Sequence, residues 1–153
     1  DTQFLNMYAA YDALSEDMKN FISGRRVLHL YQASRAPRKM GLRTKEQEAS
    51  SPGTWQPLVR LNPDTGRKAL YLNAMRMEEV EGLSEKETTD LLNELLSHCD
   101  NPEFQYSHKW RKGDVLVWDN RSTQHQGTAG FDPSERRYLH RVMLQGEAPL
   151  LAN

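Results

Sequence analysis

Apolar and polar positions along the chain follow two different periods, and each period predicts one kind of element. A helical period of three to four residues predicts helices over 6–14, 16–23 and 84–98. The last of these carries four leucines on one face, and Ser84 with Glu87 forms a capping box at its start. Ser15 is placed as the N-cap of the helix before it. The chain therefore opens with two predicted helices and has a third further along.

A period of two predicts strands in the other regular stretches. The predicted strands are 26–32, the two arms of a hairpin over 58–73, 104–110, 114–120 and 136–146. The hairpin is marked by the turn segment 62–66, whose Pro and Gly lie between two short apolar runs. Helices first, followed by several short strands around one more helix, favour a mainly β fold of sandwich or jelly-roll type with helices packed outside.

One segment, 33–57, has neither period and is rich in Arg, Lys, Ser, Gly and Pro. A connection of this length inside a compact domain is usually a lid over a site or a disordered loop. It carries a basic cluster made of Arg35, Arg38, Lys39, Arg43 and Lys45. This cluster is either an ordinary solvated loop or part of a lid that attracts anions, and the sequence leaves both open.

The overall composition narrows the class of protein. A length of 153 residues predicts a single domain over 1–153, and a formal net charge of −1 gives no basic field for nucleic acid. Charges interrupt every apolar run, so we expect no membrane span. Cys99 is the one cysteine and cannot form an internal disulfide, which fits a reducing, cytoplasmic setting.

The last predicted strand places two arginines on the same face. Alternation over 136–144 puts Arg137 and Arg141 on one side and apolar residues on the other. On an outer surface this would be unremarkable, because surface arginines are common. If the face lines a cavity, an anion must neutralise the two guanidinium groups, and a carboxylate or sulfonate suits their planar fork.

A histidine lies between the last two predicted strands. His125 follows 114–120 and precedes a Gly-containing stretch. Taken alone it is more often a partly exposed histidine than a metal ligand, because iron and zinc sites usually draw at least three protein ligands.

A family resemblance adds to this picture. WDNRSTQH at 118–125, followed by RRYLHR at 136–141, closely resembles the C-terminal part of the taurine dioxygenase/2,4-dichlorophenoxyacetate dioxygenase family. DTQF, AAYDALSEDMKNFISG, LVRLNPDTGRKALYL, EGLSEKE and KWRKGDVLVWDNR also resemble family segments, in family order, so the likeness covers the chain apart from 33–57. It implies a double-stranded β-helix (jelly roll), of which this chain holds only the C-terminal part.

The resemblance also implies roles for individual residues. His125 matches the second histidine of an iron-binding facial triad. Arg137 matches the arginine that pairs with the distal carboxylate of 2-oxoglutarate, and Thr2 matches a threonine that also bonds it. Arg141 matches an arginine near the substrate's anionic group and the cosubstrate's keto-acid end. Trp118 is expected to pack near this site.

The resemblance implies Fe(II) and the cosubstrate 2-oxoglutarate, with O2 and a small organic anion such as a sulfonate, an alkyl sulfate or an aryloxyalkanoate as reactants. Succinate and CO2 would be released as the substrate is hydroxylated. Nucleic acid and membrane are not expected partners, and a homo-oligomer is left open.

One departure from the family pattern limits this implication. The other two iron ligands belong to a His-X-Asp motif, and none of the five histidines is followed two residues later by Asp except His98, which lies at a predicted helix end. We therefore expect the chain to be the C-terminal portion of a longer enzyme that is active only at full length. The alternative is a jelly-roll module that binds a ligand or assembles with other proteins without catalysing a reaction.

Overall fold

The computed structural model of the protein describes residues 1–128, 132, 134, 136 and 138–152. Its strands are β1 (Thr2–Asn6), β2 (Arg26–His29), β3 (Thr54–Pro57), β4 (Val59–Leu61), β5 (Lys68–Leu70), β6 (Met77–Val80), β7 (Gln105–His108), β8 (Thr123–Gly127) and β9 (Leu150–Leu151). Its helices are α1 (Met7–Asp12), α2 (Glu16–Ile22), α3 (Lys45–Ala49), α4 (Glu85–Cys99) and the short 3-10 helix η1 (Pro102–Phe104).

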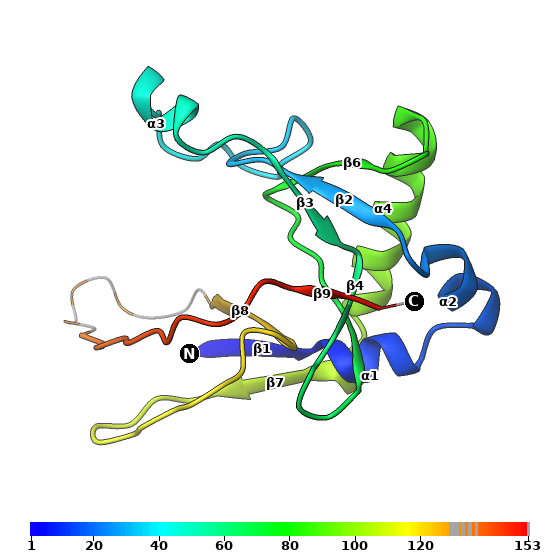
Figure 1. Cartoon of the computed structure of the whole chain (residues 1–153). Helices are drawn as coiled ribbons and strands as arrows, with labels where there is room; N and C mark the ends of the chain where they lie inside the picture. The colour runs from blue at the N-terminus through cyan, green and yellow to red at the C-terminus, as the bar shows by residue number, and fades with distance from the viewer. Residues whose placement is uncertain (129–131, 133, 135, 137, 153) are drawn as a thin grey trace.

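The strands form three small antiparallel sheets. Sheet A has the order β7-β1-β8, sheet B the order β3-β2-β6 and sheet C the order β5-β4-β9. Figure 1 shows sheet B above sheet C and sheet A below it, with α4 in green alongside sheets B and C. The chain therefore returns several times to sheets it has already begun, so segments distant in sequence lie side by side.

The hydrophobic core lies between the helices and sheets B and C. Its buried members include Met7, Ala10, Ile22, Val27, Leu58, Val59, Leu70, Met77, Val80, Leu91, Leu92 and Leu95. Sheet A meets this core through Leu5, which is partly buried against it. The neighbouring Phe4 points to the other face of the same sheet because successive strand residues alternate. One face of sheet A, that of Leu5, therefore packs against the core, and the opposite face, that of Phe4, is available for a functional site.

The N-cap residues predicted from the sequence, Ser15 and Ser84, are the N-caps of α2 and α4 in the structure. The Ser15 hydroxyl accepts from the Met18 amide at 3.2 Å, and the predicted capping box at Ser84 and Glu87 is present at the start of α4. The predicted hairpin is also confirmed, since β4 and β5 pair antiparallel across a turn in which Gly66 has a φ of 69°. That positive φ explains the glycine, because a side chain would be strained there.

The capping box makes a quantitative prediction. Replacing Ser84 with Ala removes the oxygen that accepts from the Glu87 amide and leaves the Glu87 carboxylate, 2.9 Å from the Ser84 amide, without its hydroxyl partner. We expect Ser84→Ala to lower the free energy of unfolding by about 1 kcal/mol. Ser97→Ala, at an exposed position of the same helix, is the control and should be nearly neutral. Equal losses in urea unfolding would contradict the capping role.

Two predicted strands are wrong in the part of the chain that the structure describes. Segment 114–120 forms no strand, and neither does the described part of 136–146. Their alternating apolar side chains are largely exposed, with Val117 at 88% and Leu144 at 94%. Alternation specifies two faces, but a strand also needs a neighbour to accept its backbone hydrogen bonds, and these described segments have none.

The structure also contains strands that the pattern did not predict. β1 and β8 are short and largely polar, so their strand character comes from pairing with each other rather than from an apolar period. Segment 33–57 is not uniformly irregular, because it contains α3 and ends in β3, which pairs with β2. Its role as a lid stays a prediction.

Candidate functional site

One face of sheet A gathers most of the candidate residues. Phe4 lies directly opposite Tyr106 on one side and His125 on the other, and Thr2 lies opposite His108. Directly opposed residues in antiparallel strands share a face. The pairing register therefore brings positions 2 and 4 together with position 125, which lies more than a hundred residues further along the chain.

The aromatic rings of Phe4 and Trp118 pack against His125 on this face. The ring centroids of His125 and Phe4 are 6.0 Å apart, and those of His125 and Trp118 are 5.0 Å apart. Phe4 also meets Trp118 edge-on at 5.2 Å. Phe4 is buried whereas His125 is largely exposed, so the rings hold one side of the imidazole and leave the other open. The expectation that Trp118 packs near His125 agrees with this geometry.

The electrostatics of His125 favour the neutral imidazole. Partial burial against the rings lowers the pKa of His125, and the nearby positive charge of Arg141 lowers it further. A neutral imidazole has a free nitrogen lone pair, which is the form that ligates metals. His125 therefore lies on an aromatic surface in a state suited to metal binding.

Thr2 is buried at the edge of the same face. Its exposed fraction is 8%, and its hydroxyl oxygen accepts a hydrogen bond from the Trp110 indole Nε1 at 2.9 Å. Trp110 in turn packs edge-on against His108, with the ring centroids 4.7 Å apart. Since the Thr2 oxygen is used as an acceptor, its own hydroxyl proton remains available to donate to an acceptor such as a carboxylate.

Of the two arginines in the predicted last strand, the structure describes only Arg141. Arg137 lies outside the described residues. Arg141 is exposed in a segment that forms no strand, and its Nη2 donates to the Met143 sulfur at 2.7 Å. The predicted shared strand face is therefore not present in the described segment, although the charge of Arg141 still acts on His125.

A chain of glutamine amides crosses the opposite face of sheet A. Gln126 donates to the Gln3 side chain at 2.8 Å, and Gln3 donates to the Gln105 side chain. Gln105 then donates to the backbone carbonyl of Asp100 at 2.9 Å. These bonds tie β8, β1 and β7 together behind His125. The sequence analysis did not predict these hydrogen bonds. The alternating glutamines Gln124 and Gln126 were the one sequence feature that could have indicated them.

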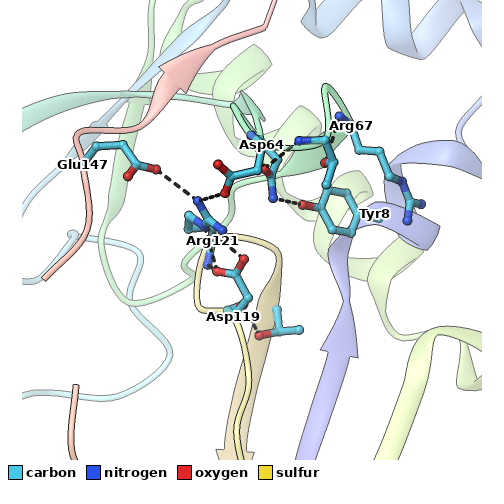
Figure 2. Close-up of polar contacts among 9 residues, drawn as sticks. Tyr8, Asp64, Arg67, Asp119, Arg121 and Glu147 are labelled. Carbon is cyan, nitrogen blue, oxygen red and sulfur yellow. Dashed lines mark hydrogen bonds and ion pairs between the residues drawn. The ribbon is translucent and has the colours of Figure 1, made fainter. Parts of the chain in front are cut away.

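Arg121 fixes the start of the strand that carries His125. Figure 2 shows its guanidinium between the carboxylates of Asp64, Asp119 and Glu147, which belong to three separate segments. The N–O distances are 2.9, 3.0 and 3.3 Å, respectively. These hydrogen bonds, led by the one to Asp64, raise the pKa of Arg121 further above its ordinary value. The WDNR motif thus connects the His125 strand to the hairpin turn and to the C-terminal segment.

The hairpin turn is itself held against α1. The Asn62 side-chain amide nitrogen donates to the Tyr8 hydroxyl at 2.6 Å. The guanidinium of Arg67 lies 4.3 Å from the centre of the Tyr8 ring (Figure 2). Arg67 also forms an ion pair with Asp12. The turn that receives Arg121 is therefore attached to the core helix rather than free in solvent.

Part of the basic cluster in 33–57 is attached to the rest of the protein. Arg35 donates to the Thr89 hydroxyl on α4 and to the backbone carbonyl of Glu78. Arg43 lies with its guanidinium carbon 4.5 Å from the centre of the Tyr31 ring. These two arginines have structural contacts, and the choice between solvated loop and lid stays open for the others.

His29 in sheet B supports a pH prediction. Burial, with a contribution from the charge of Arg76, lowers the pKa of His29 to about 4. In the unfolded chain the His29 imidazole is protonated as the pH falls below about 6.5, whereas in the folded protein it stays neutral until about pH 4. Stability from His29 is therefore complete above pH 6.5 and falls as the pH drops toward 4, by on the order of 2 kcal/mol for this partly buried ring.

The measurement is urea unfolding between pH 4 and 7. His29→Phe keeps a ring stacked on Tyr71, whose centroid lies 5.8 Å away, but cannot titrate. Its unfolding free energy should fall less steeply with acidification than that of the wild type. Parallel pH profiles for the two proteins would contradict the assignment.

The described residues do not contain a complete metal site. No group of three or more His, Cys, Asp or Glu side chains in them lies close enough to hold an ion. His98 is occupied structurally, with its Nε2 2.8 Å from the carbonyl of Ala10. Burial raises the pKa of Cys99 to about 11, which makes it a poor ligand at neutral pH. His125 is therefore a single candidate ligand in this part of the chain.

The sequence profile of the family described as "Taurine catabolism dioxygenase TauD, TfdA family" matches residues 1–143. The chain belongs to this family. The resemblance drawn from WDNRSTQH and RRYLHR is thereby confirmed.

Named relatives of this TauD/TfdA family member depend on alpha-ketoglutarate, which is 2-oxoglutarate. The chain is 40% identical over 149 residues to the alpha-ketoglutarate-dependent 2,4-dichlorophenoxyacetate dioxygenase of Cupriavidus pinatubonensis, covering 97% of this chain and 51% of that protein. It is 30% identical over 154 residues to the alpha-ketoglutarate-dependent sulfonate dioxygenase of Saccharomyces cerevisiae, covering 98% and 36%. The chain thus spans about half or less of the length of these relatives.

Solved structures agree with the family assignment. AAD-2, crystallised with Mn(II) and N-oxalylglycine, superimposes with a TM-score of 0.80 at 34% identity, covering 99% of this chain and 57% of that one. The fold of this TauD/TfdA family member is therefore that of the dioxygenases, mainly β with flanking helices, as the element order predicted. No helix among the described residues is long and apolar enough to cross a membrane.

Proposed function

We propose that the protein is a non-haem Fe(II)- and 2-oxoglutarate-dependent dioxygenase. The observation that carries this proposal is the position of His125 on the ring-lined face of sheet A, beside Trp118 and across from Phe4, in a member of this family. When bound, the iron supplies the activation of O2, and the protein supplies ligands, position and charge. 2-Oxoglutarate would be converted to succinate and CO2 as the organic substrate is hydroxylated.

The described residues supply only part of the ligand set that an iron ion needs. His125 offers one neutral imidazole, and the described residues offer no cluster that would complete the ligand set. We propose that a His-X-Asp motif outside these 153 residues supplies the other two ligands, which leaves the positions a facial triad needs for cosubstrate and O2. Activity is therefore proposed for the intact protein only.

Three residues are proposed to hold 2-oxoglutarate. Thr2 has a buried hydroxyl whose proton can donate to a carboxylate oxygen. Arg137 would meet the same distal carboxylate with its guanidinium, as the resemblance implies. Arg141, whose charge acts on His125, would lie near the keto-acid end of the cosubstrate and near the anionic group of the substrate.

The proposed substrate is a small organic anion. Relatives named for action on a dichlorophenoxyacetate and on sulfonates support this class, as does the positive charge of Arg141 beside the metal-binding face. A sulfonate, an alkyl sulfate and an aryloxyalkanoate remain the candidates. We further propose a cytoplasmic enzyme, which the single buried and poorly ionised Cys99 supports.

A substrate screen tests the class separately from the reaction. Succinate release by the intact protein would be measured with matched pairs, for example phenoxyacetate against phenoxyethanol and an alkyl sulfonate against the corresponding alcohol. We expect the anion of each pair to be preferred by at least about tenfold, which corresponds to about 1.4 kcal/mol. A preference for the neutral members would remove the anion assignment and leave the dioxygenase assignment standing.

A second function is favoured by one observation. Because the described residues contain no three-ligand cluster, a ligand-binding or assembly module without catalysis would have the same local structure. Finding His-X-Asp upstream in the full reading frame favours the enzyme, and its absence favours the module.

A further inference from the structure

A buried arginine in sheet C has no partner for one edge of its side chain. Arg60, in the middle of β4, is only 5% exposed. Its Nε and Nη2 atoms are buried and make no hydrogen bond to any residue that the structure describes. Because burial of an unpaired guanidinium is strongly unfavourable, an acceptor is required at this position.

The free edge has the geometry that grips a carboxylate. Nε and Nη2 lie on the same side of a guanidinium and can donate two parallel hydrogen bonds to the two oxygens of one carboxylate. The same protein uses this arrangement elsewhere, where Arg26 Nε and Nη2 donate to the two Glu81 carboxylate oxygens at 2.9 and 2.6 Å. At Arg60 the donor half of such a pair is present and buried.

The Arg60 guanidinium also lies over an aromatic ring. Its guanidinium carbon lies 5.3 Å from the centre of the Tyr71 ring, and His29 stacks on that ring at 5.8 Å. The His29 Nε2 atom is likewise buried without a hydrogen-bond partner in the described part of the chain. The positive charge of Arg76 acts on His29, and neither Arg60 nor Arg76 forms an ion pair within the described residues. The buried guanidinium of Arg60 therefore has no anionic partner within the described residues.

We propose that Arg60 binds a carboxylate through its Nε and Nη2 atoms. This site goes beyond the function proposed above, which does not use this residue. The carboxylate belongs either to a small organic acid or to an acidic side chain of the same polypeptide outside the described residues. Both sources provide the same two-oxygen acceptor.

The first test is ligand binding by the intact protein without added iron. Melting temperatures would be measured for the wild type, Arg60→Met and Arg60→Lys with phenoxyacetate, acetate and the neutral phenoxyethanol. A small-molecule site predicts that the two acids raise the melting temperature of the wild type by several degrees, that phenoxyethanol does not, and that both variants lose this response. Arg60→Lys keeps the charge and should fold if Arg60→Met does not.

The second test locates a carboxylate from the protein itself. A crystal structure of the intact protein should then place both oxygens of one Asp or Glu within hydrogen-bond distance of Arg60 Nε and Nη2. In that case acids do not change the melting temperature, and Arg60→Met lowers it far more than Arg26→Met, which breaks the exposed pair with Glu81. The proposal is overturned if acids have no effect and the crystal structure shows only water at this edge. Because no readout requires iron or turnover, that result would not affect the dioxygenase proposal.

Discussion

Replacing His125 with Ala should lower succinate formation by the intact protein by more than about 100-fold, even with saturating Fe(II). The imidazole is neutral, lies on a ring-lined face and leaves one side open, so it is placed to act as a ligand. Loss of an outer-shell partner typically costs about 10–100-fold in metal affinity or activity, and loss of a ligand should exceed that range. The variant should also bind Mn(II) more weakly in calorimetry, which separates metal binding from turnover.

His140→Ala is the matched control for this result. His140 is exposed and packs edge-on against Tyr138, with ring centroids 5.0 Å apart. Its replacement should leave Mn(II) affinity and succinate formation within about twofold of the wild type. Near wild-type activity in His125→Ala at saturating iron would show that the ligand assignment is wrong.

Arg137→Leu should weaken 2-oxoglutarate binding by at least about 30-fold. The reason is the loss of a charged partner for a carboxylate, which costs roughly 2–5 kcal/mol when the charge is desolvated. Thr2→Val should have a smaller effect, about 5-fold, because it removes a single neutral donor worth about 1 kcal/mol. If both residues hold the same carboxylate, the double variant should lose less than the sum of the two single losses.

The adjacent Arg136 provides the control for this series. It is exposed and the family resemblance assigns it no role, so Arg136→Leu should not change the affinity for 2-oxoglutarate. Affinities would be measured by titrating 2-oxoglutarate into the Mn(II)-loaded intact protein. An unchanged affinity in Arg137→Leu would remove this arginine from the site.

Features set by local chemistry were predictable from the sequence. The start of α4 follows from Ser84 and Glu87, and the hairpin follows from the turn segment 62–66, because these signals act over a few residues. Strands that depend on distant partners were not predictable in this way. β8 is polar and forms through its pairing with β1, whereas 114–120 alternates well and forms no strand.

The same distinction applies to the candidate site. The family motif singled out His125, Trp118 and Thr2, which periodicity alone could not do. The structure brings His125 and Thr2 onto one face of sheet A with Trp118 packed on His125, and their roles stay proposals. The supports behind that face were missed because their partners are far apart in sequence. Gln126 and Gln3 are separated by 123 residues, and Arg121 and Asp64 by 57. Such pairs become visible only once the strand register is known.

Succinate release by the intact protein is the measurement that tests the central claim most directly. Given Fe(II), 2-oxoglutarate, O2 and a panel of small sulfonates, alkyl sulfates and aryloxyalkanoates, we expect succinate to form with at least one anion. Omitting any one of Fe(II), 2-oxoglutarate or O2 should stop its formation. Succinate no higher than in the metal-free control for every anion, together with no binding of 2-oxoglutarate to the Mn(II)-loaded protein, would contradict the proposed function.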